Sequence, residues 1–216
     1  SSSGVVATDT TGVGTARYNL GASGYGGDKG IFAYGGAAGP TFLSMSNLVS
    51  NAGVVATDTT GVGTQRQGCR AAIYGYDKGI FAYGVTNYSP EAHVSVSNLV
   101  STSGVISTDV TGVGTARTSP GATEYGFDKA IFGYGHTLSP LPYYASMSNL
   151  VSNTGVVATD TAGVGTALTD ISATGYGTTG LAMFFYGEVS SATMVNTINR
   201  ISNTGVVGAT ITGAGT

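Results

Sequence analysis

Few side chains in this 216-residue chain can do acid–base, nucleophilic or metal chemistry. There are two histidines, His93 and His136, and one cysteine, Cys69. The histidines lie 43 residues apart in segments that vary between repeats, so we interpret them as loop residues and not as a metal site or a catalytic dyad. We interpret Cys69 as a small apolar core residue, because the other repeats carry no cysteine there. The sequence therefore predicts no catalytic residue, no metal site and no cofactor.

Charged residues are scarce, at 9% of the chain, and most of them recur in step with an internal repeat. Such regularity in a chain this poor in charge indicates a structural or a binding task. The acids take two positions of the repeat and the bases take two more: Asp9, Asp58, Asp109, Asp160; Asp28, Asp77, Asp128; Arg17, Arg66, Arg117; and Lys29, Lys78, Lys129.

The fourth repeat suggests how these charges pair. There the arginine becomes Leu168, and the Asp-Lys pair becomes Thr178-Thr179. Arginine and aspartate disappear together, as expected for a buried pair, since a partner left alone costs roughly 3–5 kcal/mol. The alternative is a repeated ligand site in which arginine grips an anionic sugar or a carboxylate. The predicted structural ion pairs are Arg17–Asp28, Arg66–Asp77 and Arg117–Asp128.

The aspartate that ends each Gly-Val-Val-Ala-Thr-Asp segment is expected to cap a turn by accepting backbone N–H bonds. A calcium loop needs several oxygen ligands, and each of these loops offers one carboxylate. The net charge of -3 gives no electrostatic basis for binding nucleic acid. No run approaches the roughly 18 apolar residues of a membrane helix, so we expect no membrane insertion.

A Gly-Val-Val/Ile segment recurs every 49 to 51 residues, at Gly4, Gly53, Gly104, Gly155 and Gly205. Each repeat offers four β-prone runs; in the first they are residues 12–25, 29–34, 44–49 and 53–58. Four strands in about 50 residues is the size of one kelch-class blade. We therefore predict an all-β propeller of four-stranded antiparallel blades in a single domain, 1–216. The repeats are approximately 15–63, 64–114, 115–165 and 166–216, with 1–14 as an extra last-strand segment, most simply from a preceding blade.

One connection in each repeat varies in length and content: residues 36–43, 85–94, 136–145 and 188–193. Rigid scaffolds often carry function on such loops, and these hold aromatic residues and four of the five prolines. The alternative is drift in an unconstrained loop. The candidate partner-binding residues are Phe42, Tyr88, His93, His136, Tyr143 and Tyr144.

The repeated frame runs Thr-Ala-Arg, then Tyr-Gly-x-Asp-Lys-Ala/Gly-Ile-Phe-Gly/Ala-Tyr-Gly, then Ser-Met-Ser-Asn-Leu-Val-Ser-Asn-Thr-Gly-Val-Val-Ala-Thr-Asp-Thr-Thr-Gly-Val-Gly-Thr. It resembles kelch/RCC1-like β-propeller repeats in tail fibre and virion proteins of environmental tailed phages and in some bacterial proteins. The resemblance implies a virion appendage or a secreted surface protein, located on the virion surface or outside the cell, with no enzymatic activity of its own.

The leading hypothesis is therefore a non-enzymatic structural or adhesive propeller of a phage tail fibre or virion surface. Its variable loops would face a host-surface glycan or protein, or other virion subunits, and a homo-oligomer is one expected assembly. The alternative is a secreted carbohydrate-binding lectin with a shallow pocket between blades. Repeated tyrosines could stack on sugars, but we expect them to fill the core between blades: Tyr25, Tyr34, Tyr74 and Tyr83.

Overall fold

The computed structural model describes residues 8–138, 143–190 and 193–213, which contain β-strands and no helix. The all-β expectation is confirmed. Each predicted repeat, here called modules 1 to 4, contributes one antiparallel sheet of three or four strands. Module 1 holds β1 (Gly21–Tyr25), β2 (Lys29–Ala33) and β5 (Ser46–Val49); module 2 holds β6 (Arg70–Tyr74), β7 (Lys78–Tyr88) and β8 (Glu91–Val100); module 3 holds β9 (Gly121–Tyr125), β10 (Lys129–His136) and β11 (Tyr144–Val151); module 4 holds β12 (Ser172–Tyr176), β13 (Leu181–Phe185), β16 (Thr197–Ile201) and β17 (Ile211–Thr212).

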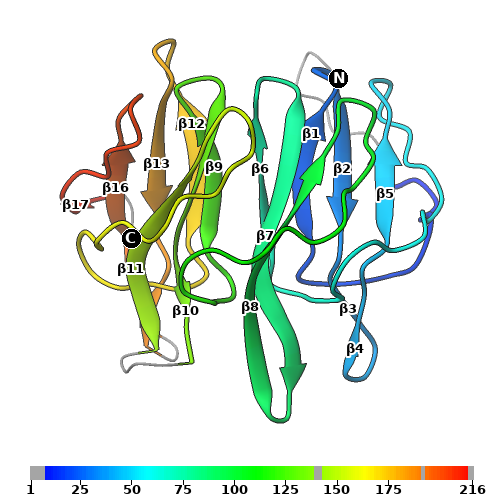
Figure 1. Cartoon of the computed structure of the whole chain (residues 1–216), viewed down its shortest axis with the longest axis horizontal. Helices are drawn as coiled ribbons and strands as arrows, with labels where there is room; N and C mark the ends of the chain where they lie inside the picture. Colours follow the sequence, from blue (N-terminus) through cyan, green and yellow to red (C-terminus); the bar gives the residue numbers. More distant parts are fainter. Residues whose placement is uncertain (1–7, 139–142, 191–192, 214–216) are drawn as a thin grey trace.

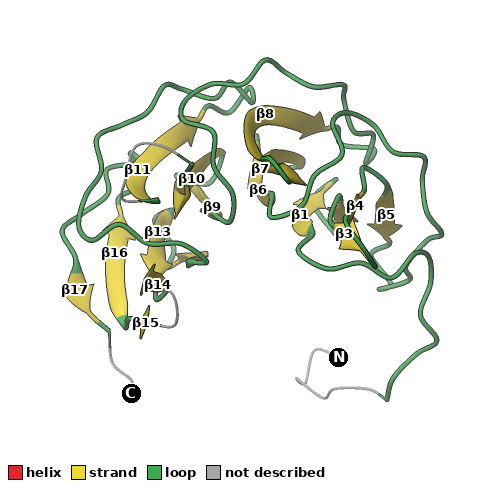
Figure 2. Ribbon diagram, turned by 90° about the horizontal axis from the view of Figure 1, so that it is seen from below, coloured by secondary structure: helices red, strands yellow, loops and turns green. Residues whose placement is uncertain are grey.

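The four sheets stand side by side in an arc (Figure 2). The first strand of each module lies innermost, and β1, β6, β9 and β12 contact one another in that order. All four line a shallow hollow of about 300 Å³. The arc is open between modules 1 and 4 (Figure 2), so the sheets of the described residues do not close into a ring. The propeller architecture therefore stays a prediction.

The fourth strand expected in each module forms in module 4 alone among the described residues, as the short β17. In module 1 the expected segment 53–58 and the next residue, Thr59, meet β5 through single bridges, Val49 to Val55 and Ser46 to Thr59. Between these bridges Asn47 Nδ2 donates to the carbonyl of Ala56 at 3.0 Å, so a side chain fills the place of a backbone ladder. Asn98, Asn149 and Asn199 make the equivalent bond in modules 2, 3 and 4. Residues 8–14 of the expected extra segment form no strand, and residues 1–7 lie outside the described residues.

Neighbouring modules are joined by repeated apolar contacts. Tyr34 is fully buried and lies edge-on to Phe81 of the next module, with ring centroids 5.4 Å apart. Tyr83 meets Phe132 and Tyr134 meets Phe184 in the same way. The tyrosines expected in the core, Tyr25, Tyr34, Tyr74 and Tyr83, are all buried, which confirms that interpretation. Cys69 is also fully buried, and burial raises the pKa of its thiol, as expected for a core residue.

From module 2 onward, the glycine of the Gly-Val-Val/Ile segment fits against the preceding module, whereas Gly53 of module 1 has no neighbour within 4 Å of a Cβ placed on it. A Cβ on Gly104 would lie 2.8 Å from Leu48 Cδ2 and 2.9 Å from the ring of Tyr25. Gly155 and Gly205 meet the same pair of residue types in modules 2 and 3. The φ angle of Gly104 is +82°, so backbone conformation and close packing both favour glycine here.

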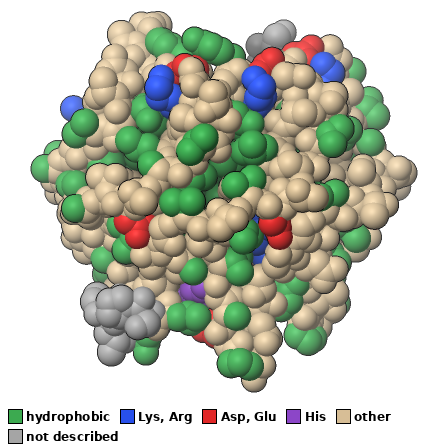
Figure 3. All heavy atoms as spheres, in the orientation of Figure 1, with side chains coloured by type: hydrophobic (Ala, Val, Ile, Leu, Met, Phe, Trp, Pro, Cys, Tyr) green, Lys and Arg blue, Asp and Glu red, His purple; other side chains and the backbone are tan. Residues whose placement is uncertain are grey.

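The arc has two unlike edges. At one edge, the upper one in Figure 1, short turns join the first two strands of each module, and Figure 3 shows lysine and acidic side chains side by side along it. The opposite edge carries the connection between the second and third strands: the hairpin β3 (Gly36–Ala37) with β4 (Thr41–Phe42), the long ends of β7–β8 and of β10–β11, and the hairpin β14 (Glu188–Ser190) with β15 (Thr193–Met194). We call this edge the hairpin rim.

Candidate functional site

The repeated arginines do not pair with the aspartates that the sequence suggested. Arg17 Nη1 lies 3.6 Å from Asp58 Oδ1, and Arg117 Nη1 lies 4.0 Å from Asp160 Oδ1. The predicted partners instead contact the lysine that follows each of them: Asp28 to Lys29 at 2.8 Å, Asp77 to Lys78 at 3.2 Å and Asp128 to Lys129 at 2.5 Å. The predicted pairs Arg17–Asp28, Arg66–Asp77 and Arg117–Asp128 are therefore wrong. Each aspartate precedes the second strand of its module, whereas the arginine bonds to a carbonyl inside that strand, at Phe32, Tyr83 or Phe132.

An asparagine links the arginine to its actual aspartate, and we call each such group an arginine cluster. In module 2, Arg66 Nη2 donates to Asn98 Oδ1 at 2.7 Å, and Asn98 Nδ2 donates to Asp109 Oδ1 at 2.8 Å. The backbone N–H and hydroxyl of Thr64 donate to Asp109 Oδ2. Asp109 accepts a backbone N–H bond, as expected, but the donor is Thr64, which lies 45 residues away and not in the turn of Asp109. The cluster thus ties the first segment of the module to its last.

These contacts shift the titration of the charged groups. Hydrogen bonds from the side chains of Thr15 and Asn47 hold the pKa of Asp58 below its ordinary value. Burial alone would raise the pKa of Asp160, but bonds from Thr115 and Asn149 outweigh burial and lower it. Burial lowers the pKa of Arg117.

The arginine also packs against a tyrosine ring of the preceding module. The Arg66 guanidinium carbon lies 3.9 Å from the centroid of the Tyr34 ring, and that of Arg117 lies 4.0 Å from the Tyr83 ring. Both arginines are fully buried. The repeated charges therefore perform a structural task at these two positions and offer no surface to an anionic ligand.

Module 4 shows why the sequence pointed to the wrong partner. Leu168 replaces the arginine, but Thr210 also replaces the aspartate of the cluster and accepts a bond from Asn199 Nδ2 at 2.9 Å. Both aspartate positions are thus lost together with the arginine, so their loss could not decide between them. The Asp-Lys turn is also longer in module 4, because Tyr176 pairs with Leu181 where Tyr25 pairs with Lys29.

The candidate partner-binding residues meet at the hairpin rim. Phe42 contacts Tyr88 across modules 1 and 2, with ring centroids 5.4 Å apart. His136 lies between His93, at 5.5 Å, and the rings of Tyr143 and Tyr144, at 5.9 and 5.8 Å. Tyr88 is 52% exposed and Tyr143 is 48% exposed. Of the four prolines expected there, Pro140 and Pro142 lie outside the described residues.

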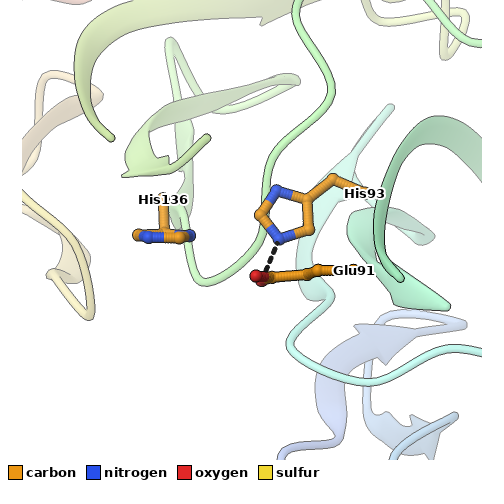
Figure 4. Close-up of side chains that lie close together, drawn as sticks. All are labelled: Glu91, His93 and His136. Carbon is orange, nitrogen blue, oxygen red and sulfur yellow. Dashed lines mark hydrogen bonds and ion pairs between the residues drawn. The ribbon is translucent and has the colours of Figure 1, made fainter. Parts of the chain in front are cut away.

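The two histidines were interpreted as loop residues, but His93 lies on β8 and His136 ends β10, and they come together with an acid (Figure 4). His93 Nε2 lies 2.8 Å from Glu91 Oε1, and one ligand atom from each of Glu91, His93 and His136 falls within 4.8 Å of the others. The His93 side chain is only 1% exposed, and burial lowers its pKa although Glu91 acts in the opposite direction. Its Nδ1 is buried with no hydrogen-bond partner among the described residues. We call these three residues the histidine cluster.

An alignment of the repeats gives His93 and His136 related positions, a signal that the interpretation from sequence missed. His136 bridges Thr118 as Val85 bridges Gln67, so His136 and Val85 are equivalent positions of neighbouring modules. Val85 is in turn the cross-strand partner of His93. The two histidines therefore stand at the same level of adjacent modules, although 43 residues separate them in the sequence.

No protein-family profile matches the chain, and no curated protein matches it either. Among solved structures, the one titled "Structure of YjhT" superposes with a TM-score of 0.55 at 10% sequence identity. The match covers 74% of this chain and 49% of that one, so this chain spans about half the length of YjhT. At such low identity the likeness concerns the fold alone. The described residues include no helix with the length and apolarity that a membrane crossing requires.

Proposed function

We propose that this protein is a non-enzymatic structural or adhesive scaffold of the propeller type, which presents its hairpin rim to a partner. One observation carries the proposal: the frame and the rim use their side chains differently. The repeated polar groups of the frame bond mainly to one another in the arginine clusters. The rim differs in every module and exposes the large aromatic rings of Tyr88 and Tyr143.

The class of partner follows from the rim's composition and from the resemblance of the repeats. Exposed tyrosine rings beside histidine and glutamate suit a host-surface protein or glycan, or a neighbouring virion subunit. The resemblance to phage tail fibre repeats suggests a virion surface or extracellular location. A carbohydrate-binding lectin is the second candidate, because the exposed faces of Tyr88 and Tyr143 could stack on a sugar ring.

The surface of module 4 at the end of the arc supports the propeller architecture that we propose. Tyr34, Tyr83 and Tyr134 are at most 1% exposed beneath the following module, whereas the equivalent Tyr186 is 42% exposed. Tyr186 lines a hollow of about 680 Å³ together with Met194 and Thr197. A further module, from a second copy or from a longer chain, would cover this surface and extend the arc toward a ring.

Rim variants test the function. Tyr88→Ser and Tyr143→Ser together should abolish binding to a candidate host surface or to one defined glycan on an array. Tyr76→Ser is the matched control, since Tyr76 is 71% exposed but precedes Asp77 at the opposite edge of the arc. Strong binding to one sugar favours the lectin, and binding to host cells without any glycan preference favours the adhesive scaffold. Equal loss of binding in the rim and control variants would contradict the assignment to the rim.

A further inference from the structure

The histidine cluster has the chemistry of a metal site. Two imidazoles and one carboxylate form a ligand set that zinc and related divalent transition metals prefer, in contrast to the all-oxygen sets of calcium and magnesium. The three side chains come from two modules: Glu91 and His93 from β8 of module 2, and His136 from the end of β10 of module 3. Figure 4 shows the nitrogen-bearing edge of the His93 ring turned toward His136, with Glu91 beside it.

A second observation separates this cluster from an ordinary hydrogen-bonded surface pair. The His93 side chain is 99% removed from solvent, yet its Nδ1 has no hydrogen-bond partner among the described residues. Leaving a buried polar atom unpaired is destabilising, so such atoms in native proteins call for an explanation. Glu91 occupies Nε2, and one histidine–carboxylate bond therefore does not satisfy the ring.

We propose that Glu91, His93 and His136 bind one divalent transition-metal ion of the zinc class, a role that goes beyond the proposed scaffold function. Ligand atoms around tetrahedral zinc lie about 3.3 Å apart, given metal–ligand bonds of about 2.0–2.1 Å. The three ligand atoms already lie within 4.8 Å of one another, and Glu91 and His136 are not buried, so small side-chain rotations complete the set. Three protein ligands leave a fourth position open to water or to a group from a partner.

The ion would join the rim hairpins of modules 2 and 3. In the described residues the rim parts of these modules meet through the edge-on contact of His93 with His136. A metal bridge fixes the His136 ring, against which Tyr143 and Tyr144 lie. The bound ion therefore orders the exposed aromatic surface that the proposed function assigns to a partner.

Metal titration of the untagged, EDTA-stripped full chain tests the proposal. We expect one Zn²⁺ per chain by calorimetry, and a visible absorption band on adding Co²⁺ that Zn²⁺ displaces. Glu91→Gln and His136→Asn each remove a ligand and should weaken Zn²⁺ binding by more than about 100-fold, since even outer-shell changes cost 10–100-fold. Mg²⁺ should not compete.

Glu188→Gln is the matched control, because Glu188 bridges Thr169 in module 4 as His136 bridges Thr118 in module 3. It should bind Zn²⁺ as the unmodified chain does. Each variant is first shown to keep its thermal unfolding midpoint in EDTA, which separates loss of a ligand from loss of fold. Absence of saturable Zn²⁺ and Co²⁺ binding in the unmodified chain would overturn the proposal, and so would unchanged binding in both ligand variants.

Discussion

The arginine clusters and the histidine cluster both gather polar side chains from segments far apart in the sequence, but the first recur in three modules and the second occurs once among the described residues. In module 2 each guanidinium nitrogen of Arg66 donates a hydrogen bond. In modules 1 and 3 the two Nη atoms of Arg17 and Arg117 also donate, but their buried Nε atoms have no hydrogen-bond partner among the described residues. The histidine cluster occurs once and leaves His93 Nδ1 unpaired. In this chain, the polar residues that recur with the repeat hold the frame, whereas the histidine cluster, which does not recur, lies at the hairpin rim, where we propose a metal site.

The largest expected effect comes from breaking an arginine cluster. Arg117→Leu should lower the free energy of unfolding by about 3 kcal/mol, because it removes a buried cation and leaves Asn149 and Asp160 without their partner. Urea denaturation of the two proteins measures this change.

Module 4 supplies the control for that substitution. Arg117→Leu combined with Asp160→Thr reproduces the pair Leu168 and Thr210, and should recover part of the lost stability because no unpaired carboxylate remains. Strictly additive losses in the double variant would contradict a coupled arginine–aspartate cluster.

Acid should weaken the frame through the same aspartates. The pKa values of Asp58, Asp109 and Asp160 lie below the ordinary value of 3.8 in the folded protein. The stability they contribute is present above that value and is lost as the pH falls through the lower folded pKa values. Urea midpoints measured from pH 6 down to pH 2.5 should decline steeply below about pH 4. Asp160→Asn should make this decline shallower, and an identical decline would remove Asp160 from the explanation.

A smaller effect is expected in the histidine cluster without metal. Glu91→Gln in EDTA should change the free energy of unfolding by less than about 1 kcal/mol, because Glu91 is 38% exposed and its pairing with His93 is solvent-screened. Thermal unfolding in EDTA checks this. A loss as large as that of Arg117→Leu would mean that the histidine cluster, too, holds the frame.

The smallest effect is expected at the Asp-Lys turns, whose charges recur in three modules but contribute little to stability. Lys78→Ala should leave the unfolding midpoint nearly unchanged, because both Lys78 and Asp77 are about 40% exposed and pairs of this kind contribute 0–1 kcal/mol. A loss above about 2 kcal/mol would show that the turns carry a structural task that their exposure does not suggest.

The sequence predicted local structure better than it predicted which charges meet. Period and β-propensity place β1, β2 and β5 within the expected runs, since glycine-bounded apolar segments leave few other choices. The expected fourth strand is reduced to single bridges in modules 1 to 3, which the β-prone residues of 53–58 did not indicate. The partner of Arg117 was hidden because module 4 changes both aspartate positions at once. Aligned repeats place His136 at the position of Val85, but the pairing of Val85 with His93 across two strands becomes visible only in the structure.

The packing of Gly104, Gly155 and Gly205 has a consequence for how such a chain changes length over evolutionary time. Each glycine packs against a tyrosine and a leucine of the module before it, so the three contact surfaces are built from the same residue types. Excising or duplicating one whole module would therefore bring matching surfaces together again. Gene segments of about 50 codons could be gained or lost by recombination without creating a mismatched joint.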